Sequence, residues 1–299
     1  MIKKKLISRF RVDPGTKVDL RKFPTDWTGS PEARKLGKGA IKRRAEEILM
    51  KNRQQLAEVQ NLLYADDTYS VLIIFQALDA AGKDGTIRHV MSGVNPQGCQ
   101  VYSFKHPSAE ELDHNFLWRY ANRLPERGRI GIFNRSYYEE VLVVKVHPEI
   151  LEAQRLPEEK KGKKVWKSRY EDINTFEQHL SRNGTVILKF FLHLSRDEQK
   201  KRFLERLDTP AKNWKFSAGD IVERGYWKEY QRAFEEAISE TSTEWAPWYI
   251  IPADRKYVTR ALVADIITSA IRNLKMEYPK LTKEKKKKLD EARKILEQE

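Results

Sequence analysis

Five apolar runs of strand length alternate along the chain with longer segments whose apolar positions recur at helical spacing. The run 71–75 is continuous and rich in β-branched residues, which is typical of a strand buried on both faces. Further strands are predicted at 99–104, 129–134, 185–194 and 248–251. Strands separated by helical segments form βαβ units, because parallel neighbours need a crossover connection. The pattern therefore predicts an α/β fold with a parallel sheet of about five strands and helices on both faces.

The segments between the strands carry helical patterns. Segment 38–64 has one apolar stripe and a face of Lys, Arg and Glu. Ser-x-x-Glu capping boxes at 108–111 and 195–198 predict helices that run to about 124 and 207. The other predicted helices are 86–93, 167–181, 218–240, 257–275 and a lysine-rich C-terminal helix at 280–299. Residues 1–37 are basic and interrupted by proline and glycine, which predicts an N-terminal arm on one domain spanning 1–299.

A glycine-lysine loop joins the first strand to the next helix. A strand, a tight loop and a helix together favour phosphate binding, because backbone N–H groups, the helix N-terminus and a lysine all attract phosphate oxygens. The match to G-x-x-x-x-G-K-[ST] is imperfect, since Ala77 occupies the first glycine position and Asp84 the hydroxyl position. A turn whose glycines only solve geometry is the alternative. The candidate phosphate-binding residues are Ala80, Ala81, Gly82, Lys83, Asp84, Gly85 and Thr86.

Ligands of parallel sheets bind at the carboxyl ends of the strands, so the loops 79–85, 105–107 and 134–139 are expected to converge there. Phosphoryl transfer needs cations around the migrating group, and Lys83 and Arg135 are the candidates. Asp79 within the loop would be tolerated beside phosphate if a divalent cation lay between them. Asp79 is therefore the candidate metal ligand, with Glu139 as a second. The alternatives are a strand-capping salt bridge for Arg135 and a surface carboxylate for Glu139.

A basic helix precedes a break at 208–210 and could form a lid at about 200–217. Lids in kinases close over the donor and exclude water. An ordinary exposed basic face is the alternative. Trp214 could stack on a base, but packing under the lid is expected. The candidate nucleotide or polyphosphate contacts are Lys105, Arg119, Arg123, Asn134, Glu139, Arg202, Arg206, Lys212 and Lys215.

The charge balance is strongly basic, because 57 Lys and Arg against 43 Asp and Glu give a formal net charge of +14. Such a surface attracts nucleic acid, anionic lipid or chains of phosphate, although a solvated basic face has the same composition. The single cysteine, Cys99, excludes an internal disulfide and is expected to pack in the core. No apolar stretch approaches the ~18–20 residues that span a bilayer, so we expect a cytoplasmic protein with no membrane partner.

Three motifs resemble the family-2 polyphosphate kinases, and class III most closely: QALDAAGKDGT at 76–86, IGIFNRSYYEEVLVV at 130–144 and LDTPAKNWKFS at 207–217. The resemblance covers about residues 10–275. It implies a P-loop kinase-like fold with a helical lid, and reversible, direct transfer of phosphate from inorganic polyphosphate to nucleoside mono- and diphosphates. It further implies Mg²⁺, with Mn²⁺ as a second metal, adenine or guanine nucleotides as substrates, and a homotetramer.

By motif position, Asp79 and Lys83 resemble the Walker A acid and lysine, and Arg135 the Walker B arginine. Many relatives have Asp at the position of Asn134, which shifts metal ligation toward Asp79. Many have Asn at the position of Glu139, where an acid fits class III. An ATP-dependent nucleotide or small-molecule kinase is the main alternative. A nucleic-acid-binding protein is disfavoured, because the sequence shows no helix-turn-helix, zinc finger, RNA-recognition aromatic pair or basic zipper.

Overall fold

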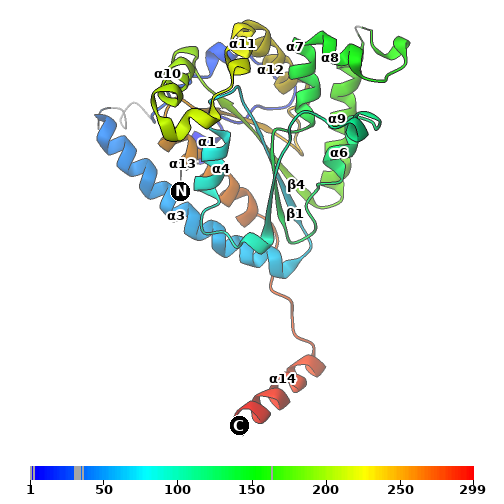
Figure 1. The fold of residues 1–299 in the computed structure, drawn as a ribbon. Helices are drawn as coiled ribbons and strands as arrows, with labels where there is room; N and C mark the ends of the chain where they lie inside the picture. Colours follow the sequence, from blue (N-terminus) through cyan, green and yellow to red (C-terminus); the bar gives the residue numbers. More distant parts are fainter. Residues whose placement is uncertain (1, 3, 30–34, 36, 163) are drawn as a thin grey trace.

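The computed structural model describes residues 2, 4–29, 35, 37–162 and 164–299. Their strands form one parallel sheet in the order β2-β3-β1-β4-β5, with β1 at the centre (Figure 1). The predicted parallel sheet is confirmed. The strands are β1 (Ser70–Gln76), β2 (Cys99–Ser103), β3 (Ile130–Asn134), β4 (Thr185–His193) and β5 (Trp248–Pro252). Because β1 pairs with β3 on one side and β4 on the other, the carboxyl end of β1 is where ligands of such sheets bind.

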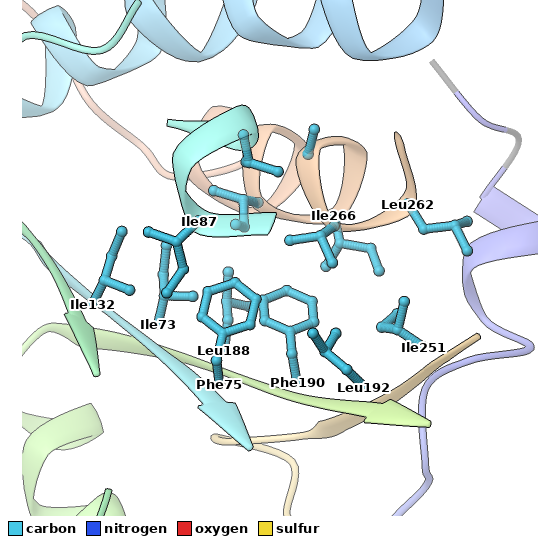
Figure 2. Packing of buried hydrophobic residues seen from close by; sticks show 14 of the residues in the cluster. Ile73, Phe75, Ile87, Ile132, Leu188, Phe190, Leu192, Ile251, Leu262 and Ile266 are labelled. Atoms are coloured by element: carbon cyan, nitrogen blue, oxygen red, sulfur yellow. The ribbon is translucent and has the colours of Figure 1, made fainter. Parts of the chain in front are cut away.

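Helices cover both faces of the sheet, as predicted. Successive side chains of a strand point to opposite faces, so alternate residues of β1 enter two different cores. Ile73 and Phe75 pack against α3 (Gly37–Asp66), α4 (Lys83–Val90) and α13 (Lys256–Arg272), as Figure 2 shows. The other core lies between the sheet and helices α9 and α12. It contains Leu72 and Ile74 of β1, Ile173 of α9 and Ile238 of α12. Those two helices are α9 (Val165–Arg182) and α12 (Trp227–Thr241).

Two predicted helices are each divided in the structure. The predicted helix 108–124 is α5 (Ala109–Leu112) and α6 (Trp118–Ala121), because the Asn115 side chain accepts the N–H of Leu117 and turns the chain between them. The capping box at Ser108 is confirmed. The predicted helix 218–240 is α11 (Ala218–Gly225) followed by α12, and glycine at the division is a weak helix former.

The remaining elements connect these layers. Part of the expected N-terminal arm, at residues 1, 3, 30–34 and 36, lies outside the described residues, while Arg11 forms an antiparallel bridge to Tyr249 of β5. Within the described ranges, no helix combines the length and apolarity needed to cross a membrane. The other elements are α1 (Lys4–Ile7), η1 (Leu20–Lys22), η2 (Pro96–Gly98), η3 (Tyr137–Val141), α7 (Val143–Val146), α8 (Pro148–Ala153), η4 (Glu158–Lys160), α10 (Arg196–Asp208), η5 (Pro210–Lys215) and α14 (Lys283–Leu296).

Helix α14 projects away from the body of the protein and is exposed along its whole length (Figure 1). Cys99 opens β2, where it is partly buried against the first core. Burial raises the pKa of its thiol to about 11, so Cys99 is a packing residue rather than a nucleophile.

A buried ion pair supports the segment that follows β3. Lys189 of β4 donates to Glu177 of α9 at 2.6 Å, and both side chains are fully buried. The hydroxyls of Tyr137 and Tyr138 each donate to the same carboxylate at 2.9 Å. Lys189 also donates to the carbonyl of Thr241 at 2.7 Å, so the charges of the pair are fully hydrogen-bonded. The network therefore fixes η3 directly beyond Arg135.

Lys189→Ala should lower the free energy of unfolding by about 3–5 kcal/mol, because it leaves the Glu177 carboxylate buried without its partner. Urea denaturation of the whole chain measures this change. The control Lys167→Ala removes an exposed lysine of α9 and should change the free energy of unfolding by at most about 0.5 kcal/mol. Equal effects of the two variants would contradict the assignment. Replacing both charges, with Lys189→Met and Glu177→Gln, should restore much of the loss.

Candidate active site

A cavity of about 570 Å³ opens at the carboxyl end of the sheet, beside β1. Its walls include segment 79–86, which we call the β1–α4 loop. Ser103 to Lys105 at the end of β2, and Asn134 and Arg135 at the end of β3, also line it. Helix α10, η5 and the start of α13 complete it. The three loops expected to converge each reach this cavity, but Pro107 and Glu139, which belong to two of them, line other cavities. The prediction that Glu139 contacts substrate in this cavity is therefore wrong.

The backbone of the β1–α4 loop has two left-handed residues directly before α4. Ala80 and Gly82 lie in the left-handed region, with φ of +62° and +100°. Gly82 is the N-cap of α4 and makes no side-chain cap. Because the first N–H groups of a helix have no partner within the helix, those of α4 remain available to an anion. The loop can therefore hold phosphate oxygens through its backbone, despite the residues that depart from the usual motif.

Lys83 lies at the start of α4 with its ammonium held inside the loop. Its Nζ donates to the carbonyl of Ala77 at 2.9 Å. Burial, followed by the positive charge of Arg135, lowers the pKa of Lys83. A lysine ammonium has three donors, so two remain for phosphate oxygens. Binding an anion would offset the cost of keeping this charge half-buried.

Arg135 bridges the two candidate acids. Its guanidinium donates to Asp79 at 2.9 Å and to Glu139 at 3.0 Å, which brings all three predicted residues together. The pKa of Arg135 is raised, mainly by the negative charge of Glu139, so Arg135 stays a cation. The backbone of Arg135 is left-handed, with φ of +67°, and such strain is common at functional sites. Asn134, its neighbour, donates instead to Asp84 at 2.8 Å.

Arg202 does not occupy the position expected of a lid cation. It is buried, with 4% of its surface exposed. Its guanidinium donates to the carbonyls of Ala80 at 3.0 Å and Ala81 at 2.9 Å, and to that of Ala253 at 2.6 Å. It also donates to the carbonyl of Asp254 at 3.2 Å and pairs with Glu198 at 2.9 Å, so all five of its N–H donors are used and none remains for a substrate. Arg202 is therefore a positioning residue that fixes the β1–α4 loop.

Three other predicted contacts, Arg206, Lys212 and Lys215, line the cavity from the predicted lid segment. Arg206 is half-buried and donates to Asp220 at 3.2 Å, while Lys212 pairs with Glu205. Trp214 is 78% exposed at the cavity, so the expected packing under the lid is wrong. The ammonium of Lys215 lies 4.9 Å from the centre of the Trp214 ring.

Arg119 and Arg123 lie away from this cavity, contrary to expectation. Arg119 is buried, donates to the carbonyl of Lys105 at 2.9 Å and pairs with Glu111 at 3.3 Å. Arg123 is exposed, and its guanidinium lies 5.5 Å from the centre of the Tyr102 ring. Both guanidinium groups therefore contribute to the surroundings of β2, and neither is among the residues that line the cavity of the β1–α4 loop.

Three cations of the cavity were missed by sequence reasoning: Arg88, Lys256 and Arg260. Lys256 and Arg260 begin the helix after β5, so applying the carboxyl-end rule to this last strand would have found them. Among the described residues, ten Lys and Arg but only four Asp and Glu line the cavity. We call it the cationic cavity, and its charge suits a ligand with several negative groups.

Asp79, which lines the cavity, and Glu139, which lies outside its lining, can together accommodate a magnesium ion. Within the described ranges, no three His, Cys, Asp or Glu side chains form a metal-binding group. Mg²⁺ commonly uses one or two carboxylates, with substrate phosphates and water completing its shell. Asp79 is partly exposed beside the β1–α4 loop, and Glu139 joins it through Arg135, so these two carboxylates fit such an ion.

The strand order, the β1–α4 loop and the cationic cavity define a P-loop kinase-like protein. In sequence, residues 40–279 match the family described as Polyphosphate kinase 2 (PPK2). The chain belongs to the polyphosphate kinase 2 family, which confirms the resemblance found in its motifs. Its fold is similar to the crystal structure of polyphosphate kinase 2 from Arthrobacter aurescens, with a TM-score of 0.80 over 91% of each chain. The two sequences are 38% identical.

Two curated relatives are similar over nearly their whole length. The ADP-polyphosphate phosphotransferase of Rhodopseudomonas palustris is 55% identical over 289 residues, or 96% of this chain and 97% of the relative. The AMP/ADP-polyphosphate phosphotransferase of Meiothermus ruber is 45% identical over 273 residues, or 91% of this chain and 96% of the relative. The names of these two relatives differ in the nucleotide acceptor.

Arg202→Lys should lower the free energy of unfolding by about 1–3 kcal/mol, because a lysine cannot satisfy all the carbonyls that the guanidinium now binds. The loosened β1–α4 loop should also bind tripolyphosphate less tightly. Urea denaturation and calorimetric titration measure the two effects. Arg196→Lys, an exposed position on the same helix, is the matched control and should change neither. Unchanged tripolyphosphate affinity in Arg202→Lys would contradict the positioning role.

Proposed function

We propose that this protein transfers phosphate from inorganic polyphosphate to nucleoside mono- and diphosphates, from AMP through ADP to ATP, in a reversible reaction. The observation that carries the proposal is the cationic cavity over the β1–α4 loop, where cations outnumber acids ten to four among the described residues. Family membership supports polyphosphate as the donor. The names of the Rhodopseudomonas and Meiothermus relatives support ADP and AMP as acceptors.

The proposed mechanism is a direct in-line transfer without a covalent intermediate. Phosphoryl transfer depends mainly on positioning and on stabilising the charge of the migrating group. The backbone N–H groups of the β1–α4 loop and the Lys83 ammonium hold the donor phosphates. Arg135, oriented by Asp79 and Glu139, supplies a fixed cation beside Asp79 at the beginning of the loop. The part of segment 200–217 that follows Arg202 acts as a lid and excludes water.

Asp79, with Glu139 as a second ligand, would hold the Mg²⁺ or Mn²⁺ ion that the family implies. When bound, the metal would neutralise phosphate charge. The same proposal includes four predictions from the sequence. The protein is a single domain, forms a homotetramer, uses adenine or guanine nucleotides as acceptors and is located in the cytoplasm.

The proposal is tested by mixing the protein, Mg²⁺ and long-chain polyphosphate with AMP alone or ADP alone and measuring ATP by luminescence. ATP is expected from both acceptors. ATP from ADP only would reject AMP as an acceptor, and no ATP from either would favour an ATP-dependent kinase.

Lys83→Ala should reduce turnover by at least about 100-fold, because it removes a cation that stabilises the transferring phosphate. The variant should keep its far-ultraviolet circular dichroism spectrum, since Lys83 makes a single hydrogen bond to Ala77. Lys167→Ala serves as the exposed control. Wild-type turnover in a folded Lys83→Ala variant would refute the role of Lys83.

Asp79→Asn should raise the Mg²⁺ concentration that gives half-maximal turnover by about tenfold or more, because the site loses a charged ligand. Excess Mg²⁺ should then restore part of the rate. Asp290→Asn, on the exposed helix α14, is the matched control and should leave the Mg²⁺ titration unchanged. If Asp79→Asn is slower but has the wild-type Mg²⁺ midpoint, Asp79 acts through Arg135 and not as a metal ligand.

A further inference from the structure

Helix α11 follows the predicted lid segment 200–217 directly and is docked through polar contacts. Figure 1 shows it beside α10 and α12. Glu223 of α11 accepts hydrogen bonds from the hydroxyl of Tyr230 of α12 at 2.5 Å and from Nε2 of His147 at 3.0 Å. Because His147 stands at the start of α8, these bonds attach α11 to two other helices. The carboxyl-terminal half of α11 therefore has a defined position against the body of the protein.

The next residue of α11 reaches the β1–α4 loop through a single glutamine. Arg224 donates to Oε1 of Gln199 of α10 at 2.7 Å, and also to the carbonyl of Arg196 at 2.8 Å. Nε2 of Gln199 donates in turn to the carbonyl of Asp79 at 2.9 Å. Gln199 is buried, so these two partners determine how its amide lies. A continuous hydrogen-bonded path therefore runs from α11 through α10 to the first residue of the loop.

The two partners of Gln199 fix which way its amide faces. A guanidinium can only donate hydrogen bonds, and a backbone carbonyl can only accept them. The amide oxygen must therefore face Arg224, and the amide nitrogen must face Asp79. Without Arg224 the amide would be free to turn over, and its oxygen would then lie against the Asp79 carbonyl with no hydrogen between them. Arg224 thus selects the orientation that holds the loop.

The path borders a cavity of about 30 Å³ behind the loop, distinct from the cationic cavity. Its lining includes Asp79, Arg135, Glu139, Gln199 and Arg224. Such a volume holds about one or two water molecules and is far too small for a nucleotide. Neither Gln199 nor Arg224 is among the residues that line the cationic cavity. Both side chains are therefore placed to act on the Asp79 carbonyl rather than on a substrate.

We propose that Arg224 is a positioning residue for phosphate transfer, because it orients the Gln199 amide that holds the carbonyl of Asp79. The inference rests on the proposed function. Asp79 is the candidate metal ligand and also pairs with Arg135 at 2.9 Å, so its placement affects both groups. Since Arg224 belongs to α11, the docking of the helix that follows the lid segment is coupled to the geometry of the β1–α4 loop.

The first test measures amide hydrogen exchange in the β1–α4 loop, which needs no catalytic activity. The N–H groups of Ala81 and Thr86 are hydrogen-bonded to nearby carbonyls. In Arg224→Met their exchange should be faster by about three- to tenfold, because the loop loses an oriented hydrogen bond. Arg224→Lys, which can still donate to Oε1 of Gln199, should restore most of the protection. Arg232→Met, on the exposed face of α12, is the matched control and should change nothing.

A double-mutant cycle tests whether Arg224 acts through Gln199. Gln199→Met removes both polar ends of the side chain at similar volume and should speed the exchange of the same N–H groups. Adding Arg224→Met to it should have no further effect, because the path is already broken. Additive effects would overturn the inference, as would unchanged exchange in Arg224→Met alone. Arg224 is partly exposed, so its single variants should keep the wild-type circular dichroism spectrum and decide the matter even if Gln199→Met does not fold.

Kinetics distinguish positioning from a contribution to stability alone. Arg224→Met should lower kcat about tenfold, because it misplaces Asp79, while KM for ADP should change by less than about twofold, since no substrate contact is removed. The Mg²⁺ concentration for half-maximal turnover should rise, as in Asp79→Asn but by less. A lower Tm with wild-type kcat and Mg²⁺ midpoint in the folded variant would make Arg224 a structural residue and overturn the inference.

The exchange measurement and the ATP assay separate this inference from the proposed function. Faster loop exchange in Arg224→Met, without ATP formation by the wild type, would keep the hydrogen-bonded path and remove the kinase assignment. ATP formation by the wild type, with unchanged loop exchange in Arg224→Met, would keep the kinase and remove the positioning role.

Discussion

The conformation of the β1–α4 loop depends on hydrogen bonds from α10 to three successive carbonyls of the loop. Gln199 donates to the carbonyl of Asp79 at 2.9 Å, and Arg202 donates to those of Ala80 and Ala81. A trans peptide directs its N–H opposite to its C=O, so carbonyls held by α10 turn N–H groups the other way. The left-handed residues Ala80 and Gly82 are kept in place by the same bonds. Both the anion-binding loop and the placement of Lys83 follow from this anchor.

Cations around the cavity fall into two groups that differ in their partners. Those of α10 and η5, such as Arg206 and Lys212, are paired with acids of the same region. Paired charges can exchange partners when a polyanion arrives, which suits a segment that moves. Arg88 of α4 and Arg260 of α13 have no paired acid in the described ranges, so their charges stay available to a bound anion. The positions of the acids therefore distinguish the paired cations of α10 and η5 from the unpaired cations of the other helices, which the positions of Lys and Arg alone do not.

The strands and the loops after them could be predicted because buried parallel strands have continuous apolar runs and their carboxyl ends share one edge. Arg202 and Arg119 were misplaced because a sequence shows charge but not burial, and both guanidinium groups instead satisfy backbone carbonyls. The division of 108–124 depended on one Asn115 turn, which periodicity does not register. Arg88 was missed because its position depends on three helices that are distant in sequence, and only packing brings them together.

The chain has one thiol, and β2 keeps Cys99 partly covered. With its pKa raised to about 11, this group is almost entirely protonated near neutral pH and reacts slowly with oxidants. A second thiol for an internal disulfide is absent from the sequence. No cysteine lines the cationic cavity, so oxidation of Cys99 would not act directly on the β1–α4 loop.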